Sequence, residues 1–385
     1  MSGATAARAA CDDCLRRALL LGRLAGYIEH VATAQPGSRS RELLALSDEA
    51  LVRATAAGKA DRVLAAAAAD DPAELRRRVA AAGCWVTCRH ERDYPPALHD
   101  LGGEAPAALI GRGDLAALTL LRDAPGVTIV GSRRGTAYGK GVARDLGRML
   151  AAAGLTVISG LALGIDAAAH GGALDGGGVT IAVLGSGPDR AYPPSNARLH
   201  RRIVAERGVA ISELPPGTGA FRWTFPARNR IMAALGRMTV VVEAAARSGS
   251  LITVGFAADL QREVGAVPGP VNAWLSEGTN GLIADGAVVV RGAEDVLDLM
   301  LGTGRLTVDA AGAALDEPLA TALTQIEAGR RSPDDVAVGL GGDAAAVSAA
   351  LARLELLGYV ESDVTGAYTR TQLARPARGT RPRGS

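Results

Sequence analysis

Short apolar runs alternate with helical segments through the middle of the chain. Between residues 127 and 300, runs of four to six mostly apolar residues are each followed by a glycine-bearing turn and a segment of helical periodicity. Because these runs are almost continuously apolar, they predict strands buried on both faces, as in a parallel sheet covered by helices. The predicted strands are 127–130, 155–159, 179–184, 209–212, 239–243, 264–267 and 287–290. We therefore expect an α/β fold with a Rossmann-like, doubly wound parallel sheet as its core.

The residues before this sheet follow a helical pattern. Apolar residues recur every three or four positions between 12 and 82, which predicts several short helices in a small N-terminal domain, 1–83. The core domain is expected to span 84–301, and its first part, 84–126, leads into the sheet. Residues 85–87 of this lead-in segment are predicted to form a strand.

The C-terminal part predicts a separate module. Residues 302–316 are rich in glycine and alanine and predict a linker, whereas 317–372 contain three amphipathic helical segments and a hairpin, the pattern of a winged helix. Its third helix offers only Arg353 as a cation, so a structural or protein-binding role is favoured over DNA reading. The basic tail, 373–385, is expected either to attract DNA weakly and without sequence preference or to be a disordered end that keeps the protein in solution.

Composition and charge limit the classes of function. Hydrophobic residues make up 48% and charged residues 21% of the 385 residues, which excludes global disorder. The net charge is only +2, so any polyanion must be held by a local arrangement and not by a field over the whole molecule. No apolar stretch approaches the roughly 18 residues of a membrane span. These features predict a cytoplasmic protein without a membrane span.

All four cysteines lie before residue 90 of the chain, where they cannot cross-link its larger part. Cys11 and Cys14 form a CxxC motif, which is a weak metal signal by itself. Cys88 and His90, or Cys84, could complete a tetrahedral zinc site with them. The alternative is that these are ordinary reduced cysteines. Beyond this structural zinc, we expect no required cofactor.

The first strand-to-helix turn has the composition of a phosphate site. Gly131, Ser132, Arg133 and Arg134 follow the first strand of the predicted sheet and precede an amphipathic helix. Small residues let backbone N–H groups approach an oxyanion, and paired arginines add charge. The alternative is a tight turn with solvated arginines. Neither GxGxxG nor a Walker loop is present, which argues against a dinucleotide-dependent dehydrogenase.

The second glycine-rich turn begins with Ser159 and Gly160 and is expected to lie beside the first. Asp166 and His170 follow it and are four residues apart, hence on one face of a helix. They are either a catalytic dyad or, as is commoner, a buried histidine held by a neighbouring aspartate.

A third candidate segment combines arginines with aromatic rings. Aromatic residues are only 3% of the chain, yet three of them occupy alternate positions between 221 and 225. Charge for the backbone and flat rings for unstacked bases are what single-stranded nucleic acid requires. The candidate contacts are Arg222, Phe225, Arg228, Asn229 and Arg230. Alternatively the aromatic residues belong to the core, and we expect Arg228 or Arg230 to be tied to a carboxylate such as Glu243.

Together these segments resemble the DprA/Smf family of DNA-processing proteins. The motifs that carry the resemblance occur in order over about 200 residues. They are YPPAL from Tyr94, GSRRGTAYG from Gly131, SGLALGID from Ser159, GSGPDRAYPPSN from Gly185, SELPPGT from Ser212, FPARNRI from Phe225, EAAARSGSLIT from Glu243, AVPGP from Ala266 and SEGTNGLIADGA from Ser276.

The resemblance implies a non-catalytic, single-stranded DNA-binding recombination mediator. Such a protein protects incoming DNA during natural transformation and helps to load the RecA recombinase; single-strand-binding protein and a second copy of the chain are further expected partners. By position, Gly131, Ser132 and Arg133 would hold phosphate, and Arg222 stands where relatives often carry lysine. Arg228 and Arg230 would line or brace the same pocket. The N-terminal cysteines depart from the family's best-known members.

The rival function is that of a nucleotide-hydrolysing enzyme from the related phosphoribohydrolase superfamily. Asp166, Glu213 and Glu243 stand near the ends of predicted strands and could act as acid or base. Those enzymes carry a PGGxGT signature, however, and the corresponding segment, EAAARSGSLIT, lacks it.

Overall fold

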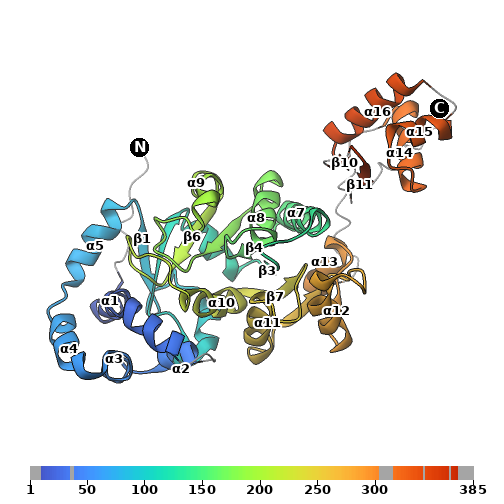
Figure 1. Ribbon diagram of the computed structural model, residues 1–385. Coiled ribbons are helices and arrows are strands. Elements are labelled where there is room, and N and C mark those ends of the chain that lie inside the picture. Colours follow the sequence, from blue (N-terminus) through green and yellow to red (C-terminus); the bar gives the residue numbers. More distant parts are fainter. Residues whose placement is uncertain (1–9, 35–38, 303–314, 341–342, 364–365, 372–385) are drawn as a thin grey trace, which may run out of the picture. The chain divides into compact units, whose positions relative to one another are not determined.

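The fold is described by a computed structural model that covers residues 10–34, 39–302, 315–340, 343–363 and 366–371 (Figure 1). The chain divides into two compact units, Met1–Met300 and Leu301–Ser385.

A nine-stranded sheet forms the centre of the first unit. Its strands are β1 (Trp85–Cys88), β2 (Ala108–Gly113), β3 (Gly126–Val130), β4 (Thr156–Ser159), β5 (Thr180–Val183), β6 (Gly208–Ser212), β7 (Gly236–Val241), β8 (Glu263–Ala266) and β9 (Val288–Val289). They lie in the order β1-β2-β6-β5-β4-β3-β7-β8-β9. All pairs from β6 to β9 are parallel, as the continuously apolar runs predict.

One strand corrects the expectation of a wholly parallel sheet. β2 was not among the predicted strands, and it runs antiparallel to both β1 and β6. Its apolar run is short and ends in Gly111, Arg112 and Gly113, so the sequence pattern there is weak. Antiparallel neighbours need no crossover helix, which is why the lead-in segment lacks the strand-helix alternation of the core. The fold is a mixed α/β fold with a mostly parallel sheet.

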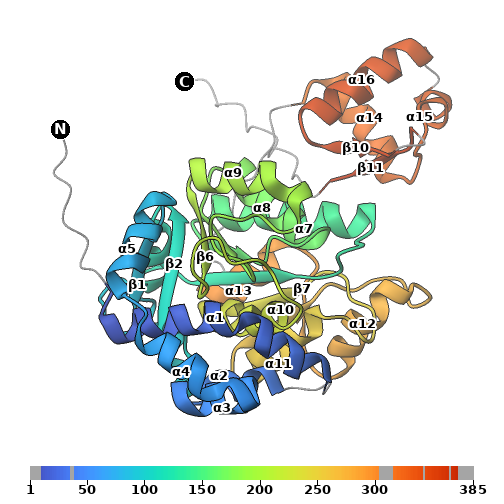
Figure 2. The same ribbon diagram turned by 60° about the vertical axis from the view of Figure 1, so that its left-hand side comes forward.

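The helices cover the two faces of the sheet in separate groups. Figures 1 and 2 show α7 (Ala137–Ala152), α8 (Ile165–Asp175) and α9 (Ala197–Ala205) on one face, and α10 (Thr224–Leu235) and α11 (Ser250–Asp259) on the other. The chain moves from β3 toward β6 in one direction and from β7 toward β9 in the other. Right-handed crossovers in opposite directions place their helices on opposite faces. The point where the order reverses lies between β3 and β7, where such sheets bind ligands.

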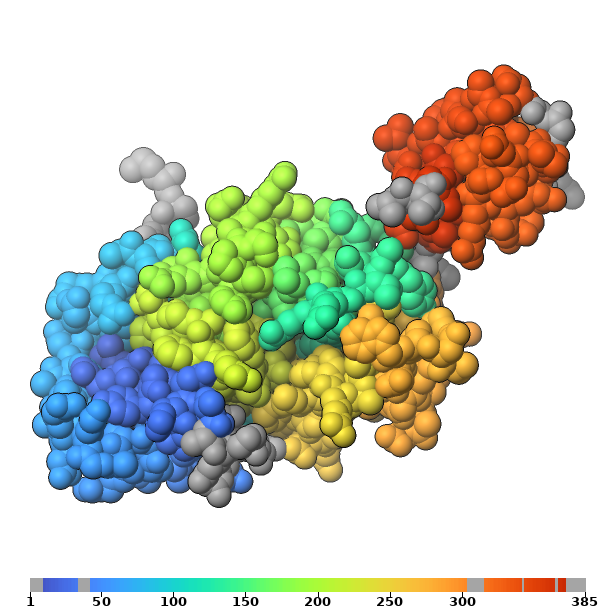
Figure 3. All heavy atoms as spheres, viewed as in Figure 1, coloured from blue at the N-terminus to red at the C-terminus, as the bar shows by residue number. Residues whose placement is uncertain are grey.

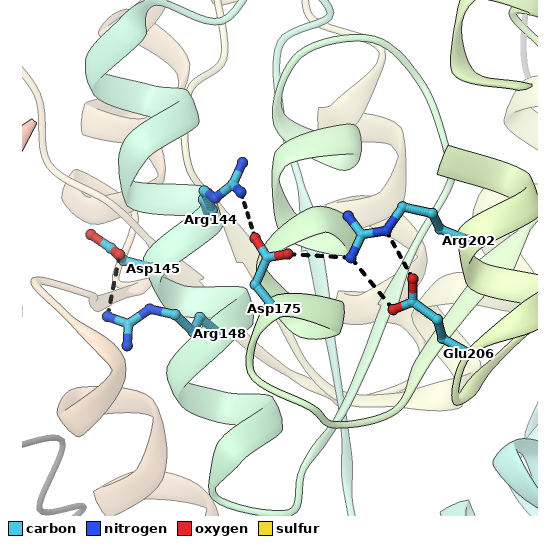
Figure 4. Close-up of polar contacts among 6 residues, drawn as sticks. All are labelled: Arg144, Asp145, Arg148, Asp175, Arg202 and Glu206. Carbon is cyan, nitrogen blue, oxygen red and sulfur yellow. Dashed lines mark hydrogen bonds and ion pairs between the residues drawn. The ribbon is translucent and has the colours of Figure 1, made fainter. Parts of the chain in front are cut away.

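The first helix layer also carries an exposed network of ion pairs, drawn in Figure 4. Asp175 at the end of α8 accepts from Arg144 of α7 at 2.5 Å and from Arg202 of α9 at 3.3 Å. Arg202 also pairs with Glu206 at 2.9 Å. Exposed pairs of this kind contribute about 0–1 kcal/mol each. Burial of the apolar helix faces on the sheet therefore dominates the stability of this layer.

Among the described residues before the sheet, five helices share apolar clusters with the core. They are α1 (Asp12–Ala34), α2 (Arg39–Ala45), α3 (Asp48–Ala56), α4 (Ala60–Ala68) and α5 (Pro72–Ala81). One cluster joins the buried leucines of α1 to Leu214, Trp223 and Ala227 of the core. In Figure 3 the blue atoms of these helices adjoin the yellow-green part of the sheet unit. Gly83, with φ +62°, follows the last of them, as the sequence predicts.

The remaining elements of the first unit are short. They are η1 (Ala57–Lys59), η2 (Pro96–Glu104), α6 (Ala116–Thr119), η3 (Leu120–Arg122), η4 (Pro194–Asn196), η5 (Trp274–Ser276), α12 (Glu277–Ala284) and α13 (Ala293–Leu301).

In its described residues, the second unit contains three helices and a hairpin around its own apolar core. Its elements are α14 (Glu317–Glu327), α15 (Pro333–Leu340), α16 (Ala344–Leu356), β10 (Val360–Ser362) and β11 (Tyr368–Arg370). Asp316 and Asp343 accept from backbone N–H groups in the first turns of α14 and α16. Residues 303–314 of the predicted linker and the predicted tail, 373–385, lie outside the described residues.

Within the described ranges, no single helix is long and apolar enough to cross a bilayer. Only α15 and α16 taken together reach that length and composition, and they are bent by 117° against one another. Their apolar side chains, Val336, Val347 and Leu351 among them, are buried in the core of the second unit. This core explains their composition.

Candidate functional site

A cavity of about 650 Å³ opens at the carboxyl ends of β3, β4 and β7, the point where the strand order reverses. The turn after β3, the start of α10 and the segment after β7 form most of its wall. Eight of the predicted contact residues line it: Gly131, Ser132, Arg133, Arg134, Arg222, Phe225, Arg228 and Asn229. Two turns and a helix start that are far apart in the sequence therefore meet in one cavity.

The lining of this cavity is strongly cationic. Its arginines are Arg133, Arg134, Arg222, Arg228 and Arg247. Asp166 is the only acidic residue in the lining, so five positive charges face one negative charge. In the described parts of the chain, only Arg228 of these arginines has a carboxylate within 4.0 Å, that of Asp166 at 3.9 Å. Arginines that the protein itself does not neutralise favour a polyanionic ligand.

The turn after β3 is fixed by the end of β7. Ser132 donates its backbone N–H to the carbonyl oxygen of Glu243 at 2.7 Å, and the Glu243 carboxylate accepts from Thr136 N at 2.8 Å and Thr136 Oγ1 at 2.6 Å. Arg134 N donates to Ser132 Oγ at 3.1 Å. Several N–H groups of the expected phosphate cradle are thus engaged within the protein. The exposed side chains of Arg133 and Arg134 are what the turn offers to an anion.

Two guanidinium groups lie over one aromatic ring. Arg133 is 5.1 Å and Arg228 5.9 Å from the centre of the Phe225 ring, within the range of cation–π interactions. Arg228 is 6% exposed and donates to the carbonyl oxygens of Gly160 and Val183. Burial lowers the pKa of Arg228 to about 10, so the group remains a cation at neutral pH. A Cβ atom at position 160 would overlap this guanidinium, which explains the glycine.

Among the described contacts, no hydrogen bond joins Asp166 to His170, so neither a dyad nor a histidine held by this aspartate is formed, whereas the expected burial of the histidine is confirmed. The Asp166 carboxylate accepts from the backbone N–H groups of Gly160 at 3.2 Å and Ala162 at 3.3 Å, and burial raises its pKa. His170 Nδ1 lies 2.7 Å from Thr180 Oγ1 on β5, and burial lowers the pKa of His170 to about 3. The aspartate closes the turn before α8, whereas the histidine packs on the sheet as a neutral group.

The other three predicted contact residues, Ser159, Gly160 and Arg230, are not among the residues that line the cavity. Arg230 is 1% exposed, and its guanidinium donates to both carboxylate oxygens of Glu213 at 2.8 and 2.7 Å. The prediction that Arg228 or Arg230 is tied to a carboxylate is therefore confirmed, with Glu213 in place of Glu243. Ser159 is fully buried and donates its hydroxyl to the Ile129 carbonyl at 2.6 Å. Arg230 therefore ties α10 to Glu213, which follows β6, and does not face the cavity.

Of the three aromatic residues in the third segment, only Phe225 borders the cavity. Trp223 is 3% exposed, lies in the apolar cluster under α1 and donates from Nε1 to the Ala25 carbonyl at 2.9 Å. Phe221 is half-buried against the same cluster. For these two residues the core interpretation holds.

The structure adds cavity residues that were not predicted from sequence. Tyr192 lies 5.3 Å from the Phe225 ring at an interplanar angle of 40°, and Arg247 and the 58% exposed Trp274 complete the wall. Tyr192 and Arg247 belong to the motifs GSGPDRAYPPSN and EAAARSGSLIT, which follow β5 and β7. Their place after the carboxyl ends of strands near the switch point was the signal that could have identified them.

The three candidate acid-base residues are separated. Only Asp166 borders the main cavity, whereas Glu213 lines a second cavity of about 490 Å³ with Arg230. Glu243 lines a third cavity of about 490 Å³ with Thr136. The main cavity therefore lacks, among the described residues that line it, the pair of carboxylates that acid-base hydrolysis would use.

The cysteine cluster lies apart from this cavity. The donor atoms of Cys11, Cys14, Cys88 and His90 all lie within 4.8 Å of one another, which is close enough to hold a metal ion. Cys84, the other completion that the sequence allowed, is not part of the group; its Sγ lies 3.6 Å from the Ala82 carbonyl.

The structure is that of an α/β protein with a cationic cavity, partly walled by aromatic rings, at the switch point of a mostly parallel sheet. Comparison with known protein families identifies the family to which this chain belongs. Residues 85–301 match the family of DNA recombination-mediator protein A. The chain belongs to this family, also called DprA or Smf, as the sequence motifs indicate.

Individual relatives agree with this membership. The Smf protein of Escherichia coli is 37% identical over 297 residues, which cover 74% of this chain and 77% of that protein. The DprA homologue of Mycobacterium tuberculosis is 45% identical over 240 residues, which cover 60% of this chain but only 61% of that relative. The structure of DNA processing protein A from Streptococcus pneumoniae aligns with a TM-score of 0.59 and 32% identity, over 75% of this chain and 96% of that one.

Proposed function

We propose that the main cavity binds single-stranded DNA and that the protein is a recombination mediator. The observation that carries this proposal is the combination of five arginines with the rings of Phe225, Tyr192 and Trp274 in one cavity. Guanidinium groups bind phosphates irrespective of sequence, and exposed rings stack with bases only where those bases are unpaired. Membership of a family of DNA recombination mediators supports the same function.

The function that we propose is non-catalytic and needs no cofactor. The separation of Asp166, Glu213 and Glu243 among three cavities supports binding without hydrolysis. A metal ion held by the cysteine cluster would be structural in this scheme, because none of those residues lines the main cavity.

The wider role that we propose is protection of incoming DNA during natural transformation and loading of RecA on it, in the cytoplasm. Single-strand-binding protein would be the competitor on the same DNA, and a second copy of the chain would extend the binding surface as a homodimer. We further propose that residues 317–372 are a winged-helix domain that contacts protein. Arg353, the cation of its third helix, already pairs with Asp316 at 3.3 Å, which favours this role over DNA reading.

Fluorescence anisotropy with a short labelled oligothymidylate tests the site. Each charge-assisted hydrogen bond contributes about 1.5 kcal/mol or more to the free energy of binding. The double variant Arg133→Ala with Arg222→Ala should therefore lose about 3 kcal/mol of binding free energy, which raises Kd roughly 150-fold. Arg201→Ala with Arg237→Ala is the matched control. These substitutions remove the same number of positive charges from exposed side chains, and neither arginine lines the cavity. The control should stay within about twofold of the parent chain.

Equal affinity of the cavity variant and the control would show that DNA binds elsewhere. Circular dichroism of both variants must match that of the parent chain, so that a loss of binding reports the site and not unfolding.

A further inference from the structure

The cysteine and histidine cluster joins two separate elements of the N-terminal region. Cys11 directly precedes α1 and Cys14 lies in its first turn, whereas Cys88 ends β1 and His90 follows it. Cys11 Sγ lies 3.3 Å from His90 Nδ1 and 3.9 Å from Cys88 Sγ, and Cys14 Sγ lies 3.6 Å from His90 Nδ1. The fold thus brings together donors that are up to 79 positions apart in the chain.

Three of the six separations between the donor atoms are close to those of ligands around zinc, and all six lie within 4.8 Å. With Zn–S of about 2.3 Å and Zn–N of about 2.0–2.1 Å, tetrahedral geometry separates two sulfurs by about 3.8 Å and a sulfur from a nitrogen by about 3.6 Å. The three separations given above, 3.3, 3.6 and 3.9 Å, lie around these distances. A disulfide needs about 2.05 Å between sulfurs, and the cysteines are free. Three thiolates and one imidazole form a closed structural zinc site.

The surroundings of the cluster suit a structural ion. Cys14 and Cys88 are 4% and 0% exposed and belong to an apolar cluster with Leu15 and Leu75. His90 is exposed on the other side, and the second cavity, of about 490 Å³, borders both His90 and Cys14. The ion would therefore have a dry side that excludes water and a wet side through which it enters.

Helix α1 connects this cluster to the main cavity. Trp223 donates from its indole Nε1 to the Ala25 carbonyl at 2.9 Å and from its backbone N–H to the Glu29 carboxylate at 3.2 Å. Ala25 lies 11 residues after Cys14 on the same helix, about 17 Å along its axis. Trp223 is adjacent in the chain to Arg222, which lines the main cavity. Cys11 and Cys14 therefore lie just before and within the first turn of α1, and later turns of the same helix bind Trp223, the neighbour of Arg222 in the chain.

We propose that Cys11, Cys14, Cys88 and His90 bind one zinc ion that fixes the start of α1 to the end of β1. Through α1, the ion also holds Trp223 and thereby the Arg222 side of the main cavity. The first part of the proposal is independent of DNA binding, whereas the second part rests on the proposed function.

Metal content tests the first part. The full chain, purified without chelators, should contain one zinc per molecule by mass spectrometry, and Cys88→Ser should lose it. Cys84→Ser is the matched control, since Cys84 lies in the same region but outside the cluster, and it should keep its zinc. Equal zinc in the Cys88→Ser variant and the parent chain would overturn the site.

A spectroscopic measurement keeps this test decisive if a variant fails to fold. Cobalt(II) added to the metal-free parent chain should give thiolate charge-transfer absorption in the near ultraviolet and the visible bands of tetrahedral cobalt. Octahedral cobalt without thiolate absorption would overturn the site irrespective of any variant.

The second part predicts a coupling between metal and DNA. Removal of zinc by a chelator should weaken binding of oligothymidylate about tenfold in the parent chain, as for the loss of one charge-assisted hydrogen bond. In Arg222→Ala the same treatment should have a clearly smaller effect, because the side chain that zinc positions is already absent.

The outcomes separate the two proposals. Equal losses in both chains, or no loss in either, would overturn the coupling and leave the zinc site standing. A zinc-loaded parent chain that does not bind oligothymidylate would refute the proposed function, and the zinc and cobalt measurements would still decide the metal site.

Discussion

The buried pair of Arg230 and Glu213 allows a direct separation of a structural arginine from a DNA-binding one. Both side chains are less than 10% exposed, at 1% and 8%, and they share two hydrogen bonds of 2.7 and 2.8 Å. Arg230→Met leaves the Glu213 carboxylate buried and uncompensated, which costs about 3–5 kcal/mol of the free energy of unfolding. For a domain of this size, about 2–3 °C in Tm per kcal/mol gives a decrease of roughly 6–15 °C.

Thermal unfolding followed by circular dichroism checks this value, with oligothymidylate binding measured well below the transition. The double variant Arg230→Met with Glu213→Leu removes both charges and should be clearly more stable than Arg230→Met alone, because no unpaired charge remains. DNA affinity should stay within about threefold of the parent chain in each folded variant. Weaker DNA binding of Arg230→Met at an unchanged Tm would refute the structural assignment of Arg230.

Three further predictions concern the cavity and its surroundings. With Arg133→Ala and Arg222→Ala combined, the slope of log Kobs against log salt should become shallower by about 1.4, since each phosphate contact on a single strand contributes about 0.7; an unchanged slope in a salt titration would contradict the contacts. His170 has a folded pKa of about 3 against 6.5 in the unfolded chain, so the unfolded state binds more protons between these values and stability rises with pH through this window. Below pH 6.5 the free energy of unfolding should fall by up to about 1.4 kcal/mol per pH unit, and urea denaturation of His170→Gln should lack this part of the slope. Gly160→Ala should displace the Arg228 guanidinium and weaken oligothymidylate binding severalfold in the anisotropy assay. An affinity equal to that of the parent chain would count against a contribution of Arg228 to DNA binding.

The sheet could be predicted because its signal is local. A strand buried on both faces needs a continuous apolar run, and the fully buried strands β3, β4, β5 and β6 appear as such in the sequence, whereas β8 and β9 are partly exposed at the sheet edge. β2 could not be identified in this way, because Ala108–Gly113 is apolar only in its first part and its pairing with β1 and β6 is set by tertiary contacts. Local patterning therefore predicts elements better than it predicts the direction of an edge strand.

The candidate site could be predicted where the side chains lie on a turn, and less well where they lie on a helix. The arginines after β3 lie in the cavity because the carboxyl ends of strands near the switch point gather there. Arg228 and Arg230 are both in α10 and two residues apart, hence about 200° apart around its axis. They cannot both face one cavity. If residues 228–230 are taken as helical and not as extended, the sequence predicts that Arg228 and Arg230 point in different directions, one toward the cavity and one away from it.

The partners of the buried residues could not be predicted, because they come from distant parts of the chain. Trp223 bonds to Ala25 across 198 positions, and the sequence gives no indication of this pairing. The cysteines are the intermediate case. Composition limited the possible ligands to a few, and only the fold shows that Cys88 and His90 complete the group while Cys84 lies outside it.

The cavity is held against its own electrostatic repulsion. The nearby charge of Arg133 adds to burial in lowering the pKa of Arg228, and Asp166 offsets this only in part. The protein keeps such a cluster together because the turn after β3 is tied to Glu243, which follows the neighbouring strand β7, and α10 is tied by Arg230 to Glu213. In the proposed function, a bound polyanion would relieve the repulsion without rearrangement of these supports. Because phosphates and unstacked bases occur in every single strand, this preorganised arrangement favours strength of binding over choice of sequence.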